Sequence, residues 1–468
     1  MPNIKDSRVI KAGVGYLIGN CLVKGMAFFS LPLFTRLMTP ENFGLYSIYL
    51  SYEAIIVLII GLALHSSIKN AYYDFKENFN AYIASCTSMM ILVFFLCLFL
   101  AAVFIQDIVV VTKFKPLIIY CLIFHGFAGA IFAVYNVYLS IFYEYKKFVI
   151  ISFINTVFNI VLSIALMLFV FQDNTYIGRI LGTVIPYCFM AVFIIYLFYK
   201  KNMTIFSPKY WKYGIGYSLP IVLHGMSQVG LGYANRIIIQ NFFGDFYAGI
   251  FSFSFILNTI FLLIINSLEN SWSPWFYEKL NDKDYFSIRK RYKQLLYGMT
   301  IVLNLLLFFA PELIAFLAPD SYSQAIYTAV PLCISAFFIF LYKFPAEVEY
   351  FFGKTRSIAF ATIIAALLNV GVSLYIGKYV GYIGIAYVNL AAYILYYLFH
   401  RYLANKILNT SIFSNKDTIV CISMSLIMAV GVLNIERLVL RSLIMLIIIS
   451  YIGWENKNLI KSFCFEKK

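Results

Sequence analysis

Long uncharged segments are the feature that most restricts how this chain can fold. Each is long enough to cross a bilayer as a helix, because the hydrocarbon core is spanned by about 20 helical residues. The segments without Asp, Glu, Lys or Arg that we interpret as membrane spans are 81–105, 116–143, 148–171, 180–199, 213–235, 246–268, 294–311, 321–342, 357–377, 379–400 and 418–435. So many such segments in one chain predict a polytopic membrane protein.

Three further apolar segments carry charged residues within them. They are 12–34 with Lys24, 43–64 with Glu53, and 438–454 with Arg441 near its start. With these we expect about fourteen transmembrane helices and an all-α fold. The first segment is too long for a signal peptide and lacks a small-residue cleavage site, so we expect it to stay in the protein.

Composition and charge agree with this interpretation. Hydrophobic residues make up 62% of the chain and charged residues 12%, against roughly 45–50% and 25% in soluble domains. These values exclude a soluble globular protein and a disordered chain. Most of the 36 Lys and Arg lie in alternate connections beginning with the N-terminal segment, which predicts cytoplasmic N- and C-termini. This distribution accounts for the net charge of +15 without nucleic acid as a partner.

The first six predicted helices recur after an offset of roughly 205 residues, so we looked for a duplication. The matching landmarks, in chain order, are GLYS at 44–47 with GIFS at 249–252, Tyr73-Asp74 with Tyr277-Glu278, Asn159 and Ser163 with Asn369 and Ser373, and YIG at 176–178 with YIG at 382–384. Their common order favours an internal duplication over chance similarity.

The duplication predicts two six-helix lobes, 1–204 and 205–408, followed by an additional helix pair 13–14 and a cytoplasmic tail at 409–468. Because six is an even number, both lobes start from the same side of the membrane. They would then be related by a pseudo-two-fold axis along the membrane normal. Transporters of this design hold their substrate between the halves and rock one half against the other. The repeat therefore indicates a transporter.

The chain shows none of the common motifs of catalysis or cofactor binding. It has no G-x-x-x-x-G-K-[ST], no H-E-x-x-H and no Cys/His cluster. Its connections are too short for an aqueous catalytic domain. We therefore expect a membrane transporter rather than an enzyme, with no cofactor and no metal. We interpret the four His as packing residues, with proton relay as the alternative.

The segment LPLFTRLMTPENFGLYS at 31–47 resembles the Wzx-type flippases of O-antigen and capsular polysaccharide repeat units. The second half supports the resemblance. KYWKYG at 209–214, SLP at 218–220 and the pair Asn235-Arg236 are similar to the start of that family's second lobe. This chain has Asn235 where the family often has Asp.

The resemblance implies membership of the multidrug/oligosaccharidyl-lipid/polysaccharide exporter superfamily. It also implies movement of undecaprenyl-diphosphate-linked oligosaccharide from the inner to the outer leaflet of the bacterial plasma membrane. The implied partners are that lipid-linked substrate, membrane lipid, and the polysaccharide polymerase and glycosyltransferases of the same pathway. Two alternatives stay open. One is a cation-coupled multidrug exporter of the same superfamily, and the other is a non-transporting membrane scaffold for polysaccharide enzymes.

Charges inside predicted spans are the candidate functional residues, because a charge at the bilayer centre costs about 2.5–3.5 kcal/mol on insertion scales. We expect Lys24, Arg236 and Lys343 to bind the diphosphate of the substrate. For Lys24 the alternative is a structural ion pair with Glu53. For Arg236 the alternative is snorkelling to the outer interface.

The carboxylates Glu53, Glu347 and Glu349 are candidates for ion coupling or for structural ion pairs. Lys343 and Glu347 are four residues apart on one helical face, which predicts an internal pair. Glu349 follows close to the cytoplasmic end of the same helix, where we expect solvent to reach it. A multidrug exporter would use Glu53 or Glu347 as its coupling carboxylate.

Overall fold

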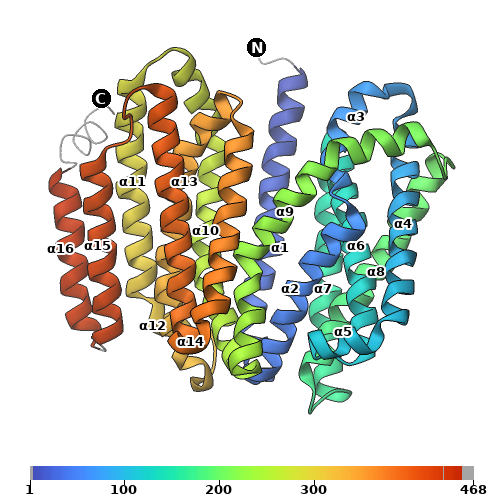
Figure 1. The fold of residues 1–468 in the computed structure, drawn as a ribbon, viewed down its shortest axis with the longest axis horizontal. Helices are drawn as coiled ribbons and strands as arrows, with labels where there is room; N and C mark the ends of the chain where they lie inside the picture. The colour runs from blue at the N-terminus through green and yellow to red at the C-terminus, as the bar shows by residue number, and fades with distance from the viewer. Residues whose placement is uncertain (1–3, 436, 456–468) are drawn as a thin grey trace. The chain divides into compact units, whose positions relative to one another are not determined.

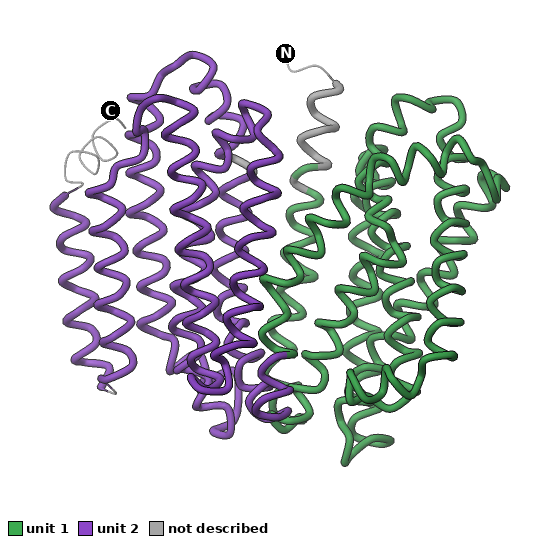
Figure 2. The backbone as a smooth tube through the Cα atoms, in the orientation of Figure 1, with its two compact units in different colours: residues 1–237 green, residues 238–468 purple. Residues whose placement is uncertain are grey.

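The computed structural model describes residues 4–435 and 437–455, with the backbone alone for 4–12, 14, 270 and 271. Every regular element in this part of the chain is a helix (Figure 1). The helices pack into two compact units, residues 1–237 and 238–468, which Figure 2 colours separately. The predicted cytoplasmic tail at 456–468 lies outside the described residues.

Unit 1 is built from long helices joined by short connections. Its α-helices are α1 (Ile4–Leu37), α2 (Pro40–Gly61), α3 (Ile68–Asp74), α4 (Phe79–Val103), α5 (Ile105–Thr112), α6 (Pro116–Ile141), α7 (Tyr145–Phe169), α8 (Thr175–Lys201) and the first part of α9 (Pro208–Phe243). Within this unit α3 and the start of α9 lie at one end and α5 lies at the other (Figure 1). The boundary between the units falls inside α9.

Local sequence explains where the helices of unit 1 begin. Thr39 is the N-cap of α2 and its side chain accepts a hydrogen bond from the backbone N–H of Asn42. Pro40 and Pro116 occupy the first turns of α2 and α6. Proline fits this position because its fixed φ is helical and its missing N–H would have no partner there.

Helix α6 is the central helix of unit 1 and packs against α2, α4 and α8. Its rings Tyr135 and Tyr138 join Phe79 of α4 and Phe198 of α8 in a buried aromatic cluster. Helix α7 packs against both α1 and α8. This packing holds α7 in place by its two neighbours and leaves a further face of it toward a cavity described below.

Unit 2 also consists of long helices joined by short connections. Its α-helices after α9 are α10 (Asp245–Asn281), α11 (Tyr285–Phe308), α12 (Ala310–Leu317), α13 (Ile326–Phe351), α14 (Thr355–Leu408), α15 (Asn415–Asn434) and α16 (Leu438–Glu455). Helix α13 is the central helix and packs against α10, α14 and α15. Gly381 divides α14 into two helices, with φ of 73° and ψ of 175°. Glycine adopts this left-handed φ without the steric penalty of a Cβ.

Eleven helices in the described residues are long and apolar enough to cross a membrane, or 12 if the bent pair α11 and α12 forms one span. The prediction of an all-helical, multi-pass membrane protein is confirmed. The count of fourteen is not confirmed by length and composition, which treat α14 as one span although Gly381 breaks it. The lobe boundary at 204/205 and the pseudo-two-fold axis stay predictions.

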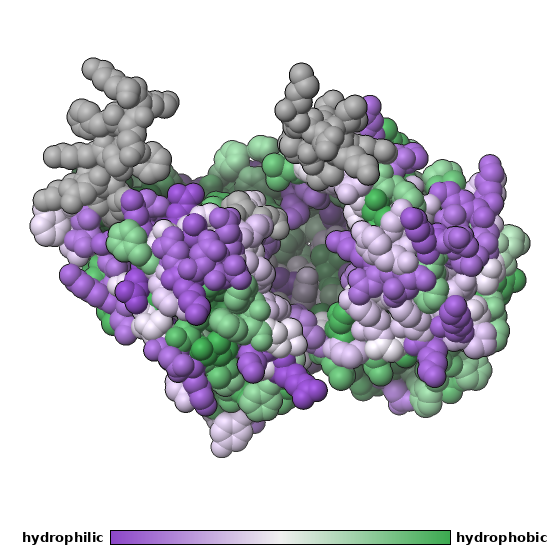
Figure 3. All heavy atoms as spheres, turned by 90° about the horizontal axis from the view of Figure 1, so that it is seen from above, coloured by the Kyte–Doolittle hydropathy of each residue, from purple (hydrophilic) through white to green (hydrophobic). Residues whose placement is uncertain are grey.

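Hydrophilic side chains gather at the helix ends of unit 1 that Figure 3 views from above. This end carries α3 and the connection between α8 and α9 (Figure 1). Lys200 and Lys201 lie in the last turn of α8 at this end. A polar, cationic helix end is where the chain leaves the apolar part of a bilayer.

Candidate functional site

A cavity of about 800 Å³ lies inside unit 1. Helices α1, α2, α6, α7, α8 and α9 contribute its walls. The lining residues that can form hydrogen bonds are Tyr46, Glu53, His125, Asn136, Ser152, Asn155, Thr156, Asn159, Thr183, Tyr187 and Tyr233. Most of these groups are uncharged amides and hydroxyls. The cavity therefore combines apolar walls with hydrogen-bonding groups that are mostly uncharged.

One helix supplies a continuous polar wall of this cavity. Ser152, Asn155, Thr156 and Asn159 of α7 all line it, and their spacing of three and four residues puts them on one helical face. Asn155 is 5% exposed, and its side-chain oxygen has no hydrogen-bond partner in the described part of the chain. A buried polar atom without a partner is costly, so it marks a position where a ligand or water can bind.

Asn159 is oriented by Arg179 of α8. The guanidinium Nη1 of Arg179 donates to Oδ1 of Asn159 at 2.6 Å and to Oγ of Ser163 at 2.8 Å. Because arginine only donates, Asn159 must present its oxygen to Arg179. Its NH₂ group is then the part of the amide available to the cavity. Arg179 forms no ion pair with a carboxylate among the described residues.

Aromatic rings hold Arg179 from its other side. The guanidinium carbon lies 3.8 Å from the ring centroid of Phe34 and 5.0 Å from that of Tyr46. Cations over aromatic faces are attracted by the ring quadrupole. Arg179 is thus held by neutral groups alone, and its positive charge is left uncompensated beside the wall formed by α7.

Close helix packing makes this arrangement possible. A Cβ atom placed on Gly178 would come within 2.9 Å of the backbone of Met167, and one on Gly182 would overlap the backbone of Ser163. Both glycines lie on α8 and face α7, four residues apart. Small residues at this spacing let two membrane helices approach closely. They bring Arg179 within hydrogen-bond distance of α7.

Glu53 of α2 is the one carboxylate in the described lining of this cavity. Its Oε1 lies against Gly129 of α6, where an added methyl group would come within 3.2 Å. Among the residues that the structure describes, no hydrogen bond or ion pair reaches Glu53. The alternative pair between Lys24 and Glu53 is therefore absent from the described structure. Lys24 is exposed on α1, beside Val23, which lines the cavity.

Arg236 lies on α9, close to the same cavity. Its guanidinium carbon is 5.0 Å from the ring centroid of Tyr233, and Tyr233 lines the cavity. Two of the three cations predicted to bind substrate thus lie on helices that border this cavity. The third, Lys343, lies on α13 in unit 2.

The predicted pair of Lys343 with Glu347 is corrected by the structure. Lys343 instead forms an ion pair with Glu269 of α10, and Glu347 accepts a hydrogen bond from Ser273 of α10. Both partners lie 74 residues earlier in the chain. Helices α10 and α13 pack closely enough for Lys343 and Glu347 to contact side chains of α10 directly. Lys343 and Glu347 therefore tie two helices together.

The prediction that solvent reaches Glu349 is wrong, because its side chain is 0% exposed. Glu349 lies 2.5 Å from Nδ1 of His400 and accepts a hydrogen bond of 2.5 Å from Ser357. These partners lie on the two halves of α14. The turn from α13 to α14 folds back over the carboxylate, which removes it from solvent. Glu349 therefore joins three helical segments.

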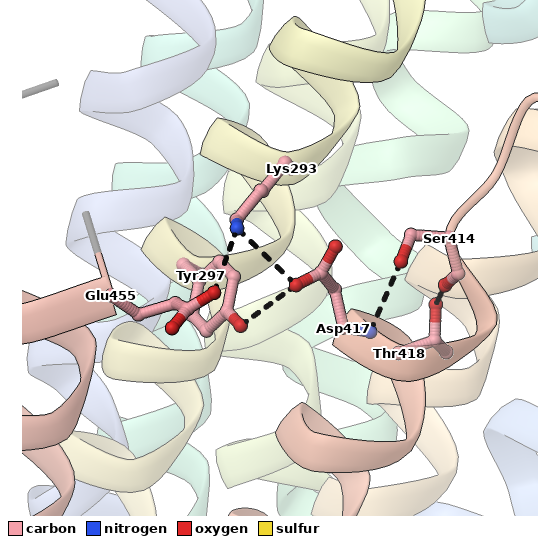
Figure 4. Close-up of polar contacts among 6 residues, drawn as sticks. All are labelled: Lys293, Tyr297, Ser414, Asp417, Thr418 and Glu455. Carbon is pink, nitrogen blue, oxygen red and sulfur yellow. Dashed lines mark hydrogen bonds and ion pairs between the residues drawn. The ribbon is translucent and has the colours of Figure 1, made fainter. Parts of the chain in front are cut away.

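Other charges of unit 2 fasten the last two helices. Nζ of Lys293 on α11 lies 3.5 Å from Asp417 of α15 and 3.1 Å from Glu455 of α16, as Figure 4 shows. Tyr297 also donates to Asp417, at 3.0 Å. The cluster connects three helices through one lysine. We interpret it as structural.

Arg441 of α16 makes a second attachment of the same kind. Its side chain is 2% exposed, donates to the backbone oxygen of Phe308 at 2.8 Å and forms an ion pair with Glu312 of α12. The charge within the last predicted span is therefore compensated inside the protein. A buried, paired arginine of this kind is costly to disturb.

Comparison with known proteins decides the family. The model of the family described as polysaccharide biosynthesis protein matches residues 10–279, more than half of the chain. The chain belongs to this family. The resemblance found at 31–47 and at the start of α9 lies within the matched residues.

Two relatives of the chain come from Haemophilus influenzae. The chain is 22% identical to Lsg locus protein 1 over 396 residues, which are 81% of this chain and 94% of the relative. It is 25% identical to a second membrane protein over 386 residues, which are 79% of this chain and 89% of that one.

Solved structures of other proteins match the fold of this chain. The lipid II flippase MurJ, in an inward closed conformation, matches with a TM-score of 0.71 at 16% identity, covering 95% of this chain and 99% of that one. An inward-facing multidrug transporter of the MATE family matches with a TM-score of 0.64 at 15% identity, covering 82% and 96%. The chain therefore has the same fold as these two structures.

Sequence reasoning missed Arg179. The uncharged segment 180–199 begins just after Arg179, so the sequence predicts Arg179 in the connection before that span. The structure starts α8 at Thr175 and places Arg179 one turn inside it. A signal existed, because Asn159 and Ser163 are part of the repeat and their spacing marks a polar helix face. In the second half Ile385 follows Gly384 where Arg179 follows Gly178, so the cation is specific to the first half.

Proposed function

We propose that this protein is a flippase that moves undecaprenyl-diphosphate-linked oligosaccharide from the inner to the outer leaflet of the bacterial plasma membrane. The observation that carries the proposal is the polar face of α7 in the cavity of unit 1. Neutral amides and hydroxyls in a row are the groups that hydrogen-bond to sugar hydroxyls without binding any ion tightly. The family and the fold support a transporter of this class.

The chemistry of the lining suits a glycan in two ways. The wall of α7 offers hydrogen-bond donors and acceptors, including the NH₂ of Asn159 and the unpartnered oxygen of Asn155. Helices α2, α8 and α9 contribute the rings of Tyr46, Tyr187 and Tyr233. Aromatic rings have an apolar face and a polar edge or hydroxyl, which lets them contact both the faces and the hydroxyls of a sugar.

The diphosphate needs positive charge, and we assign it to Lys24 and Arg236, with Lys343 as a third candidate. Lys24 and Arg236 lie on α1 and α9, beside lining residues of the cavity. Arg179 adds an uncompensated charge behind the wall of α7. The prenyl tail would stay in lipid. Transport would proceed by alternating access of the two lobes, with both chain termini in the cytoplasm.

A second function has one specific observation in its favour. Glu53 is an unpaired carboxylate in the cavity, and a cation-coupled multidrug exporter needs such a group. The rest of the described lining carries no further carboxylate, which is a poor match to a cationic drug. We therefore rank this function below the flippase.

The test is a deletion strain complemented with variants. We expect the deletion to accumulate lipid-linked oligosaccharide on the inner leaflet, and wild-type protein to reverse this. Asn155→Ala together with Asn159→Ala should fail to reverse it at equal protein level. Asn434→Ala is the matched control, because Asn434 is exposed on α15 and donates only to the backbone of its own helix.

Two results would contradict the proposal. One is an unchanged lipid-linked pool in the deletion strain together with increased sensitivity to cationic drugs, which would favour the exporter. The other is full complementation by the double variant, which would show that Asn155 and Asn159 of α7 are not needed for transport. Lys24→Ala and Lys343→Ala, tested in the same strain, separate the predicted diphosphate contacts from the glycan wall.

A further inference from the structure

A second large cavity of unit 1 lies away from the one described above. It has a volume of about 710 Å³ and lies at the ends of α6, α7 and α8. Its charged and polar lining residues are Asn80, Glu144, Lys147 and Lys201, and its apolar and aromatic lining consists of Tyr135, Tyr138, Leu139, Phe142, Ile150, Ile151, Phe193, Leu197 and Phe198. One end is thus polar, and the rest is apolar.

The floor of this pocket is rigid. Tyr135 and Tyr138 are 5% and 7% exposed and stack with parallel rings, and Phe198 packs edge-on against both. The ring centroid of Phe142 lies 5.0 Å from that of Tyr138. These rings belong to the core of unit 1, so the pocket does not depend on a mobile side chain for its shape.

The rim of the pocket is apolar and exposed. Ile150 of α7 and Phe193 of α8 are 56% and 48% exposed. Ile150 lies more than one turn from the start of α7, and Phe193 lies two turns from the end of α8, the two helix ends that border the pocket. In a membrane-spanning chain, apolar side chains exposed at that depth face lipid chains. The apolar part of the pocket is therefore open to the bilayer.

The polar end carries one cation that the protein does not neutralise. Nζ of Lys201 donates to the hydroxyl of Tyr138 at 2.5 Å and lies 4.7 Å from its ring centroid. Lys201 has no ion pair within the described residues. Lys147, in contrast, pairs with Glu144 at 3.3 Å. The lining therefore has one net positive charge, and Lys201 is where an anion would bind.

We propose that this pocket binds an anionic phospholipid, with the phosphate of its headgroup at Lys201 and an acyl chain along Ile150 and Phe193. The arrangement of a basic group above an apolar slot between membrane helices matches the shape and charge of such a lipid. A free anion would leave the apolar slot unfilled, and a zwitterionic lipid would bring a second cation to Lys201. The site is separate from the glycan cavity, and the proposal stands without the proposed function.

The experiment measures bound lipid on purified full-length protein in membrane discs containing equal amounts of phosphatidylglycerol and phosphatidylcholine. Native mass spectrometry after gentle extraction counts the lipids that stay bound. We expect wild-type protein to retain phosphatidylglycerol in preference to phosphatidylcholine. Lys201→Gln should reduce this retention by about tenfold, because a single charge-assisted contact to phosphate is lost.

Lys200→Gln is the matched control. Lys200 is the neighbouring residue and has the same charge, but it does not line the pocket, and its Nζ lies 5.9 Å from the ring of Tyr196 instead. We expect this variant to retain phosphatidylglycerol as the wild type does. Equal losses in Lys200→Gln and Lys201→Gln would show a general effect of surface charge and would overturn the proposal.

A pocket-filling variant tests the apolar half with all charges intact. We expect Ile150→Trp to lose the retained lipid, and Ile154→Trp to keep it, because Ile154 is also exposed on α7 but lies outside the lining. Retention by both tryptophan variants would contradict a seated acyl chain.

Competition identifies the source of the anion. Inorganic phosphate should not displace phosphatidylglycerol, and neither should undecaprenyl diphosphate. Displacement by inorganic phosphate would mean a site for free anions. Displacement by the prenyl diphosphate would assign the pocket to the transported substrate. Either result would overturn an anionic phospholipid as the occupant.

Discussion

Arg179 on α8 donates a hydrogen bond of 2.6 Å to Oδ1 of Asn159 on α7, and so it fixes which end of that amide faces the cavity of unit 1. No acidic partner accompanies this contact in the described structure. A charged residue placed inside a membrane helix without a counter-ion is expensive. We explain the presence of Arg179 by its hydrogen bond to Asn159, which orients that amide in the cavity wall.

We expect Arg179→Met to lower transport at least about tenfold, since a hydrogen bond to a charged group contributes about 1.5–3 kcal/mol and Asn159 would then be free to turn. Arg179→Lys should fail as well, because an ammonium lacks the planar guanidinium that lies over the ring of Phe34 and so is not held in place to donate to Asn159 and Ser163. The measurement is complementation of the deletion strain at matched protein level.

A double-mutant cycle separates orientation from charge. If Arg179 acts through Asn159, then Arg179→Met combined with Asn159→Ala should be no worse than Asn159→Ala alone. Additive losses would show that Arg179 acts by itself. Full activity of Arg179→Lys would likewise show that the positive charge is sufficient and that the guanidinium geometry is not needed.

The carboxylates Glu53 and Glu349 should respond oppositely to neutralisation. Glu53 has no partner in the described structure, so Glu53→Gln removes a desolvation cost and should raise the melting temperature by about 2 °C or more. Glu349 is buried against His400 and Ser357. Breaking a buried pair costs about 3–5 kcal/mol, so Glu349→Gln should lower the melting temperature.

For both variants we would measure the melting temperature in detergent and transport activity by complementation of the deletion strain. We expect Glu53→Gln to lose transport although it folds more stably, which is the behaviour of a functional group. A lower melting temperature for Glu53→Gln would mean that it has a structural partner. An unchanged melting temperature for Glu349→Gln would show that Glu349 does not stabilise the fold.

Gly182 sets the distance between α7 and α8. A Cβ at this position would overlap the backbone of Ser163, so Gly182→Val should force the helices apart and lower both stability and transport. Gly298 of α11 is the control, because a Cβ there meets nothing within 4 Å. Gly298→Ala should be neutral or stabilising, by up to about 1 kcal/mol from helix propensity. Thermal unfolding of both variants decides the matter, and a stable Gly182→Val would contradict the close packing.

Arg441 holds α16 against α11 and α12. Arg441→Met should destabilise the protein by about 1.5–3 kcal/mol, because the charge-assisted hydrogen bonds of Arg441 to Glu312 and to the backbone oxygen of Phe308 are lost. The control is Arg437→Met, which removes an exposed arginine shortly before α16. We expect transport per folded molecule to be the same in both variants. A large loss of transport in Arg441→Met without a change in melting temperature would instead give the C-terminal helices a part in transport.

The membrane-spanning, all-helical character of the chain followed from its sequence alone. An apolar segment of about 20 residues has few other stable environments, so hydropathy determines where the chain crosses the bilayer. The family could be recognised at 31–47 for a similar local reason, because that motif is contiguous in the chain. The polar positions Asn159 and Ser163 were also visible, through their spacing in the repeat.

Only the tertiary structure decided which charges meet. Lys343 pairs with Glu269, 74 residues earlier, and not with Glu347 in its own helix. Glu349 is buried by the turn into α14, and Arg179 is brought to α7 by two glycines on α8. Each of these contacts depends on the rotation and spacing of two packed helices. Hydropathy measures how apolar a helix is and carries no information on which neighbour its polar face will touch.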